Sequence, residues 1–534
     1  MNDRNEPRGA GANPGVLERV QGALSQAVKR QFLHRPLTGH FDAVLLRAWA
    51  EEALSGRRLI IVSNREPYSH VRSGDGVRVL RNPGGLVVAL DAVLRATGGV
   101  WVAHGSGDAD LEQSDSAGRV RVPVDAPAYT LARTWLSQEE QDGYYSGFSN
   151  GALWPLCHVA YVRPRFELSD WNQYEAVNRK FAQAVLGVAG STRAVVLLQD
   201  YHLGLCAKFI KEERPDIPVG LFWHIPWPNP EIFRILPWKT PFLEGLLAND
   251  LLGFHLRYHG MNFLDTVSAE LEARVDLARM SVERRGHLTK VRAFPISTDI
   301  DGIAAQAESP ECLRATARWR ERLGVGGHLV GLGVDRLDYT KGIPERMTAL
   351  RRLFEKHPEW RGRLKFIQLG VPSRVMLDEY RRLTERLDEQ VRALNAEFGS
   401  PDDPVVHFLK GDFDFADVIA RYRLGDFAAV TSLHDGMNLV AKEYVAARSD
   451  LGGALILSPF TGAARELQEA VLVNPYDADA LADAFHQVLS GPPETSRARM
   501  AALRERLHRH TIYDWAKELL ESIRRLGPGP HEAR

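Results

Sequence analysis

Short, continuous runs of apolar residues recur along most of the chain and alternate with longer amphipathic stretches. Each run has the length of a strand that is buried on both faces of a parallel sheet. The runs lie at 58–67, 194–200, 218–224, 328–334, 364–370, 427–433 and 454–460. The stretches between them, such as 171–189 and 373–398, repeat apolar residues at helical spacing. This alternation predicts an α/β fold with doubly wound parallel sheets.

The length of 534 residues implies more than one domain, because a single hydrophobic core stops growing at about 250–300 residues. A helical segment and a glycine-rich joint at 308–327 directly precede a strand, which places the domain boundary there. The predicted organisation is an N-terminal extension over 1–56, Rossmann-like domains over 57–322 and 323–500, and a C-terminal helix with a frayed tail over 501–534 that crosses back to the first domain. Within the extension we expect a disordered start and helices at 17–27 and 41–54. These helices could pack on the body, mediate oligomerisation or dock a partner.

Composition and charge exclude several classes of protein. The formal net charge is −1, so no global basic field favours nucleic acid or an anionic membrane as a partner. No apolar run reaches the length of a transmembrane helix, and the N-terminus lacks the apolar stretch of a signal peptide. The three cysteines match no metal or redox spacing, so we expect buried thiols without disulfides and a cytoplasmic location.

The sequence HDGMNLVAKEYVAAR at 434–448 follows a predicted strand and opens a helix. Gly436 permits a tight turn, and N–H groups at a helix start can hold an anion or a hydroxyl-rich ligand. Asp435 at the strand end could accept hydrogen bonds from sugar hydroxyls, and Glu443, two turns into the helix, could bind a diol. A simple N-cap and a solvated carboxylate explain the same residues equally well.

The sequence GVDRLDYTKGIPER at 333–346 carries Arg336 and Lys341 across a strand-to-loop transition. Two fixed cations at that place suit a diphosphate, where negative charge accumulates as a nucleotide leaves. A pair of surface cations is the alternative.

Other candidate groups also fall at or near strand ends. Because ligands of doubly wound sheets sit outside the carboxyl ends of the strands, we expect these groups to meet in one cleft between the domains. Individually, each has an ordinary structural explanation, such as an aromatic residue in the core. The groups are Arg65, Gly84, Gly85, Tyr145, Trp154, Asp200 and His224.

In this order, the motifs resemble the trehalose-6-phosphate synthase family of retaining glycosyltransferases over about 58–525. The segments that carry the resemblance are DGMNLVAKEY, RLDYTKGIPER, DYHL, HIPWPNPEIF and the YY-FSN-LWP run. The resemblance implies a GT-B fold, in which two Rossmann-like domains, the first for the acceptor and the second for the nucleotide-sugar donor, face a central cleft. It also implies transfer of glucose from UDP-glucose, or another NDP-glucose, to glucose 6-phosphate, which gives α,α-trehalose 6-phosphate and NDP.

The resemblance assigns roles residue by residue. Donor binding falls to Gly84, Gly85, Arg336, Lys341, Phe413, Asp435, Leu439, Val440, Ala441, Lys442 and Glu443. Acceptor binding falls to Arg65, Tyr145, Trp154, Asp200 and Arg374, and the catalytic group comprises Arg336, Lys341, Asp435, His224 and Asp200. We expect no metal or other cofactor. We also expect a homo-oligomer. Every matched motif starts after Arg58, so we expect residues 1–56 to be dispensable for the chemistry.

Two positions depart from the family pattern on the acceptor side. Glu66 follows Arg65 where an apolar residue is usual, and Ala103-His104 stands where the family has Gly-Trp. NREPY also resembles glucosylglycerol-phosphate synthases, whereas Arg374 in a PSR context is a trehalose-type feature. Another phosphorylated acceptor, such as glycerol 3-phosphate, is therefore one alternative. A catalytically silent sugar-phosphate sensor is a second, against which the intact donor motifs argue.

Overall fold

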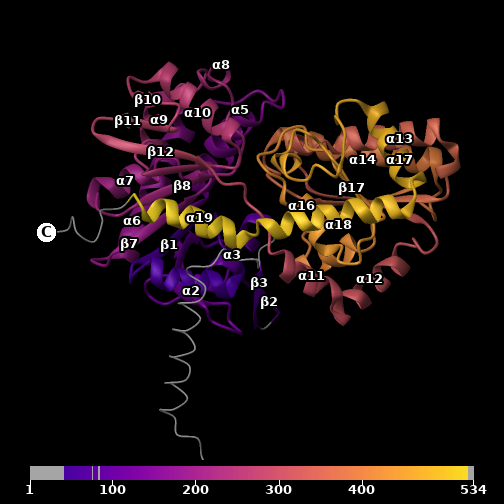
Figure 1. Ribbon diagram of the computed structural model, residues 1–534, viewed down its shortest axis with the longest axis horizontal. Coiled ribbons are helices and arrows are strands. Elements are labelled where there is room, and N and C mark those ends of the chain that lie inside the picture. The colour runs from indigo at the N-terminus through magenta and orange to yellow at the C-terminus, as the bar shows by residue number, and fades with distance from the viewer. Residues whose placement is uncertain (1–40, 75, 82–83, 527–534) are drawn as a thin grey trace, which may run out of the picture.

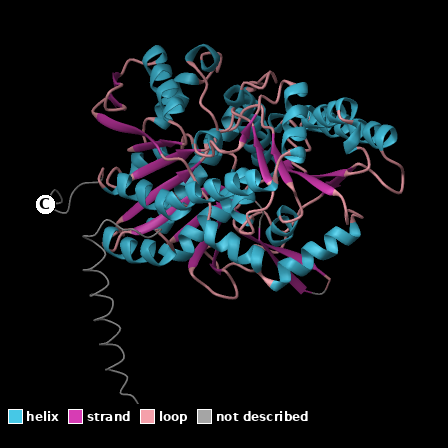
Figure 2. Ribbon diagram, turned by 45° about the vertical axis from the view of Figure 1, so that its right-hand side comes forward, coloured by secondary structure: helices cyan, strands magenta, loops and turns pink. Residues whose placement is uncertain are grey.

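The computed structural model describes residues 41–74, 76–81 and 84–526, and these residues form two α/β domains that lie side by side (Figure 1). Helices cover the strands of both domains (Figure 2). The predicted helix at 17–27 lies outside the described residues, whereas the one expected at 41–54 is helix α2 (Ala43–Ala53). The predicted class, α/β with doubly wound parallel sheets, is confirmed.

Within the described chain, ten strands of the first domain form one sheet in the order β10-β11-β12-β9-β8-β7-β1-β4-β6-β5. The strands from β12 to β6 in this order pair in parallel, and the strand order reverses direction at β1, between β7 and β4. Their bounds are β1 (Arg58–Arg65), β4 (Val100–His104), β5 (Arg119–Val122), β6 (Tyr129–Thr134), β7 (Ala194–Gln199), β8 (Val219–Trp223), β9 (Leu251–Phe254), β10 (Arg274–Asp276), β11 (Ser281–Arg284) and β12 (His287–Ala293). A separate antiparallel pair consists of β2 (Tyr68–Ser73) and β3 (Gly76–Arg81).

Helices of the first domain connect these strands and cover the sheet. One of them, η1, has the wide turns of a π-helix, a feature that is frequent at functional sites. The helices other than α2 are α3 (Gly85–Thr97), α4 (Gln138–Glu140), η1 (Gln141–Leu153), α5 (Trp154–His158), α6 (Leu168–Ala189), η2 (Tyr201–Leu203), α7 (Cys206–Glu213), α8 (Pro230–Phe233), α9 (Lys239–Leu246) and α10 (Arg257–Glu270).

Six described strands of the second domain form a parallel sheet in the order β15-β14-β13-β16-β17-β18. Numbered within the domain, this is the 3-2-1-4-5-6 order of dinucleotide-binding folds, whose ligand site lies where the order reverses. Here that point lies between β13 and β16. The strands are β13 (Leu329–Arg336), β14 (Leu364–Val371), β15 (Val406–Lys410), β16 (Phe427–Val430), β17 (Ala454–Leu457) and β18 (Val471–Leu472). The helices between them are η3 (Tyr339–Lys341), α13 (Ile343–Lys356), η4 (Pro358–Trp360), α14 (Asp378–Phe398), α15 (Phe415–Tyr422), α16 (Leu439–Ala447), η5 (Gly462–Arg465) and α17 (Ala478–Ser490).

The chain leaves the first domain earlier than the sequence boundary at 322/323. Helices α11 (Ile300–Glu308) and α12 (Pro310–Arg322) pack on α15 and α16 of the second domain. Thr316 Oγ1 donates to the Ala420 carbonyl at 3.1 Å, and the Arg421 guanidinium lies 3.8 Å from the centroid of a Trp319 ring. The apolar side of α12 packs against α15, so α12 is a part of the second domain.

Two C-terminal helices carry the chain back across both domains, as Figure 1 shows in yellow. Helix α18 (Pro493–Arg509) packs on α16 and β17, and α19 (Ile512–Arg524) packs on α2, α3 and β9. The boundary placed at 500/501 therefore falls inside α18, and the chain changes domains at 510–511. Thr511 caps α19 and donates from Oγ1 to the Phe41 carbonyl at 2.9 Å.

Helix α2 is an integral part of the first domain. Leu46 and Ala50 are buried in a core that α3 and α19 also build. Removal of 1–56 would therefore remove core residues, although none of the cavity-lining residues described below comes from this segment.

All three cysteines, Cys157, Cys206 and Cys312, are buried and unpaired, which confirms that prediction. In the described part of the chain, no helix combines the length and the apolar character that crossing a membrane needs.

Candidate active site

A cavity of about 360 Å³ lies between the two domains and collects most of the predicted residues. The strand ends at both points of reversed order contribute to it. Strand β1 ends in Arg65, and Asp200 follows β7; β13 ends in Arg336, and Asp435 lies beyond β16. The predicted residues that line the cavity are Arg65, Gly84, Gly85, Tyr145, Trp154, Asp200, His224, Arg336, Lys341, Arg374, Phe413, Asp435, Leu439, Val440 and Glu443.

Two predicted donor-binding residues, Ala441 and Lys442, do not line this cavity. The Lys442 ammonium donates to the Ile296 carbonyl at 2.7 Å and pairs with Glu466 at 2.8 Å. The Ala441 side chain is buried in the core. The helical period explains the difference, because α16 turns 439, 440 and 443 toward the cavity and 441 and 442 away from it.

Glycines allow the two domains to approach closely around the cavity. A Cβ atom on Gly436 would lie 2.2 Å from the His224 carbonyl oxygen, and one on Gly85 would lie 2.7 Å from Leu439 Cδ1. Neither distance is compatible with a side chain, so both contacts between the domains require glycine.

Lys341 and Asp435 form an ion pair on the second domain's side of the cavity, with Nζ 2.5 Å from Oδ2. Asn438 Nδ2 donates to the same oxygen at 3.2 Å. Burial opposes ionisation of Asp435, but the Lys341 ammonium outweighs it and holds the pKa of the carboxyl well below its usual range. Arg336 lies nearby with its side chain 34% exposed, so its guanidinium can reach an anion in the cavity. The pair and Arg336 together leave net positive charge at this wall.

Arg374 is held by several contacts at the edge of the cavity. Its Nη1 donates to Asp338 Oδ2 at 2.9 Å and to the Tyr380 hydroxyl at 2.5 Å, and its Nη2 donates to the Tyr201 hydroxyl at 3.2 Å. Its guanidinium carbon also lies 3.9 Å from the centroid of the Trp154 ring. These contacts span both domains and fix the plane of the guanidinium.

Asp338, which the sequence interpretation did not single out, lies 2.9 Å from Arg374 and 4.0 Å from Arg336, two cations of the cavity. It is fully buried, and it accepts from Thr340 N at 3.0 Å and Oγ1 at 2.9 Å. Burial raises the pKa of its carboxyl, but Arg374, Arg336 and Lys341 outweigh burial and lower it. Its position between the two cations of RLDYTK was the signal in the sequence.

Tyr145 lies among three arginines from different parts of the chain. Its ring stacks on His202 with centroids 5.5 Å apart. Burial raises the pKa of its phenol, but Arg374, Arg65 and Arg336 outweigh burial and lower it. This cluster of cations beside a phenol is suited to a phosphate group.

His224 is held as a neutral imidazole, because burial lowers its pKa to about 3. Its Nε2 lies 2.8 Å from Gln199 Oε1. With that amide oxygen as the acceptor, Nε2 carries the proton and Nδ1 is left as an acceptor. Its backbone N–H donates to Asp200 Oδ1 at 3.1 Å. Burial raises the pKa of Asp200 to about 7, although the backbone N–H donors of Tyr201 and His224 oppose the shift.

Glu443 and Phe413 lie on the second domain's side of the cavity. The Tyr422 hydroxyl donates to Glu443 Oε2 at 3.0 Å. Burial raises the pKa of Glu443 to about 7, against the effect of this hydrogen bond. The free Oε1 faces Gly85 across the cleft, so a diol at this place would find a carboxylate acceptor and a flat aromatic neighbour.

The fold and the cavity define a two-domain glycosyltransferase of the GT-B type. Residues 57–525 match the model of glycosyltransferase family 20, and the chain belongs to this family. The motif resemblance and the predicted enzyme class, a glycosyltransferase of the trehalose-phosphate synthase type, are thereby confirmed.

Relatives and solved structures agree with this placement. A trehalose-6-phosphate synthase of Mycolicibacterium vanbaalenii is 40% identical over 486 residues, which cover 89% of this chain and 97% of the relative. The solved structure of the E. coli protein bound with UDP-2-fluoro glucose has a TM-score of 0.76 and 31% identity, and the match covers 88% of this chain and 99% of that one. The α,α-trehalose-phosphate synthase (UDP-forming) of Burkholderia xenovorans in complex with glucose-6-phosphate has a TM-score of 0.78 and 30% identity, with 87% and 100% covered.

Proposed function

We propose that the protein transfers glucose from UDP-glucose, or another NDP-glucose, to glucose 6-phosphate and releases α,α-trehalose 6-phosphate and NDP. The observation that carries the proposal is the pairing of two cationic groups in one cavity. Arg336 and Lys341 lie at and beyond the end of β13 in the second domain, and Arg374 of the second domain joins Arg65 of the first around Tyr145, with Arg336 beside both groups. The bound ligands of the E. coli and Burkholderia structures, a UDP-glucose analogue and glucose 6-phosphate, support the same pair of substrates.

The proposed chemistry is front-face substitution with retention at the anomeric carbon. The bond between glucose C1 and the β-phosphate oxygen breaks, the anomeric hydroxyl oxygen of the acceptor bonds to C1, and its proton passes to the leaving diphosphate. Arg336 and Lys341 stabilise the negative charge that grows on the leaving diphosphate. This charge is larger in the transition state than in the substrate, so the two cations bind the transition state more strongly. Neutral His224 offers Nδ1 as an acceptor to a hydroxyl of the donor glucose, and Asp435 offers its carboxylate.

Transfer should not require a divalent metal, because the two cations already serve the diphosphate. Within the described part of the chain, His357, Glu359 and His486 form the one group of potential ligands whose atoms lie within 4.8 Å of one another. None of the three lines the cavity. The two imidazole rings stack with their centroids 3.7 Å apart and their planes 7° apart, so the two ring planes do not meet within bonding distance, as a shared metal would need. Activity that EDTA abolishes and metal restores would contradict this proposal.

A panel of acceptors tests the function directly. The protein is incubated with UDP-glucose and, in turn, glucose 6-phosphate, glycerol 3-phosphate and glucose, and products are identified by mass and NMR. We expect glucose 6-phosphate to have the highest kcat/KM. The His104 side chain, at one of the two positions that depart from the family pattern, does not line the cavity, and its Nδ1 lies 3.1 Å from the Thr134 carbonyl oxygen. This departure is therefore no argument against glucose 6-phosphate. A higher kcat/KM with glycerol 3-phosphate would assign that acceptor instead. Separately, the homo-oligomer expected from the sequence stays a prediction.

A further inference from the structure

A buried cluster of charged side chains lies directly behind the acceptor side of the cavity. It begins at Glu66, the residue after Arg65, where the chain turns from β1 into β2. Arg65 lines the cavity, whereas the Glu66 side chain is fully buried. Consecutive residues of an extended chain point to opposite sides, so Glu66 faces the interior while its neighbour faces the acceptor.

Both carboxylate oxygens of Glu66 are anchored. Oε1 accepts from the Ser106 backbone N–H at 2.8 Å and from Ser106 Oγ at 2.9 Å. Oε2 accepts from Arg133 Nε at 2.8 Å, and the side chains of Arg133 and Glu66 are both fully buried. The backbone that carries Arg65 is therefore tied to the loop after β4 and to β6.

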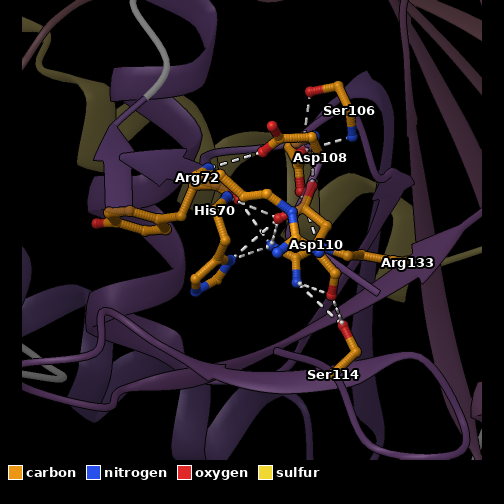
Figure 3. A network of polar contacts seen from close by, with 10 residues as sticks. His70, Arg72, Ser106, Asp108, Asp110, Ser114 and Arg133 are labelled. Atoms are coloured by element: carbon orange, nitrogen blue, oxygen red, sulfur yellow. Dashed lines mark hydrogen bonds and ion pairs between the residues drawn. The ribbon is translucent and has the colours of Figure 1, made fainter. Parts of the chain in front are cut away.

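The same cluster extends along β2, as Figure 3 shows for the residues around Asp110. Arg133 Nη2 lies 2.8 Å from Asp110 Oδ1 and donates to the Tyr68 carbonyl at 3.0 Å. Asp110 Oδ1 accepts from the His70 backbone N–H at 2.7 Å, and its Oδ2 accepts from the Gly107 N–H at 2.7 Å. Arg133 thus links the residue after Arg65 to the strand that leads away from it.

Two carboxylates share one guanidinium in this cluster, and the electrostatics couple them. Burial and the neighbouring Asp110 carboxyl raise the pKa of Glu66, while Arg133 opposes the shift. A buried ion pair of this kind contributes little net stability compared with apolar packing, but removing one partner is costly. Such an arrangement is best explained by the geometry that it imposes on the adjacent backbone.

We propose that Glu66 is a positioning residue for the acceptor: held by Ser106 and Arg133, it fixes the backbone of Arg65 and so places the Arg65 guanidinium on the acceptor's phosphate. The inference rests on the proposed function, because it assumes a phosphorylated acceptor on that side of the cavity. Glu66 does not touch substrate, and its effect passes through Arg65.

The principal variant is Glu66→Gln, which preserves shape. The amide NH₂ must face either the Ser106 N–H or the Arg133 Nε–H, so one anchoring bond is lost whichever way the amide turns. We expect the KM for glucose 6-phosphate to rise about fivefold to thirtyfold. The kcat/KM for unphosphorylated glucose and the affinity for UDP should stay unchanged. Equal losses with glucose and glucose 6-phosphate would show a general structural defect and overturn the proposal.

A double-mutant cycle tests whether the effect passes through Arg65. In an Arg65→Ala background, Glu66→Gln should change the acceptor KM by less than about twofold, because the guanidinium that Glu66 positions is absent. Additive effects of the two changes would contradict the proposal. Ser106→Ala, which removes only the hydroxyl contact, serves if Glu66→Gln folds poorly, and it should raise the same KM about twofold to threefold.

The matched control is Arg72→Gln on β2, the strand that follows Glu66. The Arg72 side chain pairs with Glu112 at an exposed site, so this variant should retain wild-type kinetics. The wild-type protein is measured first with the full acceptor panel. If the protein prefers another phosphorylated acceptor, the proposed function is wrong but the inference about Glu66 is still tested. The KM values of the variants are then measured with that acceptor, and we expect the same loss of preference for the phosphorylated over the unphosphorylated form.

Discussion

Substitution of Arg374 should separate acceptor recognition from donor recognition. Arg374→Ala removes the guanidinium that Asp338, Tyr380 and Tyr201 hold in place. A charge-assisted hydrogen bond to phosphate contributes about 1.5–3 kcal/mol, so kcat/KM for glucose 6-phosphate should fall about tenfold to 150-fold. The kcat/KM for glucose should change much less, since glucose has no phosphate.

The variant also has a structural cost that the assay must control. Asp338 would lose the cation 2.9 Å away, and breaking a buried ion pair costs about 3–5 kcal/mol of stability. Arg374→Lys retains the charge beside Asp338 but loses the planar fork, so it should be more stable than the alanine variant and still bind the acceptor more weakly than the wild type.

The assay is steady-state kinetics with both acceptors, together with UDP titration by calorimetry at a temperature where circular dichroism shows each variant folded. UDP affinity should fall by much less than kcat/KM for glucose 6-phosphate, because donor diphosphate contacts are assigned to Arg336 and Lys341. A small change is expected, since Asp338 couples Arg336 to Arg374. A large loss of UDP affinity with an unchanged preference for the phosphorylated acceptor would refute the assignment of Arg374 to the acceptor.

Three further predictions concern the donor side, the core and the dependence on pH. Arg336→Ala should lower kcat/KM about tenfold to 150-fold with either acceptor, and normal kinetics would exclude it from diphosphate binding. Leu46→Ala should lower the free energy of unfolding by about 2–5 kcal/mol in denaturant titration, whereas an unchanged midpoint would show that α2 is not part of the core. Stability should decrease as pH falls below about 6.5, because the unfolded chain then protonates histidines that the native state keeps neutral. Glu66, Asp200 and Glu443, with pKa raised to about 7, take up protons in the native state and oppose this trend. The histidines whose pKa burial lowers outnumber them, because they also include His202, His255 and His434. A melting temperature that rises from pH 6.5 to 4.5 would contradict this prediction. The histidines with the clearest values are His158 and His224, with pKa lowered to about 3 by burial, and His259, with pKa lowered to about 4.

Most of the fold and the cavity follow from local patterns in the sequence. Strands buried on both faces appear as continuous apolar runs, so their positions could be read directly, and parallel strands bring their carboxyl ends to one edge. That rule brings Arg65 and Asp200 to one edge of the first sheet and Arg336 and Asp435 to one edge of the second, and both edges line the same cavity.

What the patterns could not show depends on contacts between distant segments. Arg374 of the second domain donates to Tyr201 of the first, 173 residues away, and no local signal marks such a pair. The place where one domain passes into the next depends on such contacts too, since α12 packs on α15 and its own periodicity does not indicate this partner. The position of Lys442, in contrast, could have been predicted from the sequence, because the helical period of α16 places this residue on the side away from the cavity.

The central claim is that one cavity joins glucose from UDP-glucose to glucose 6-phosphate with retention. The most direct test is NMR of the product formed from these two substrates. The account predicts a disaccharide phosphate with two α-anomeric protons and no free anomeric centre, together with UDP in equal amount. A β-linked product, or UDP release without a disaccharide phosphate, would contradict it.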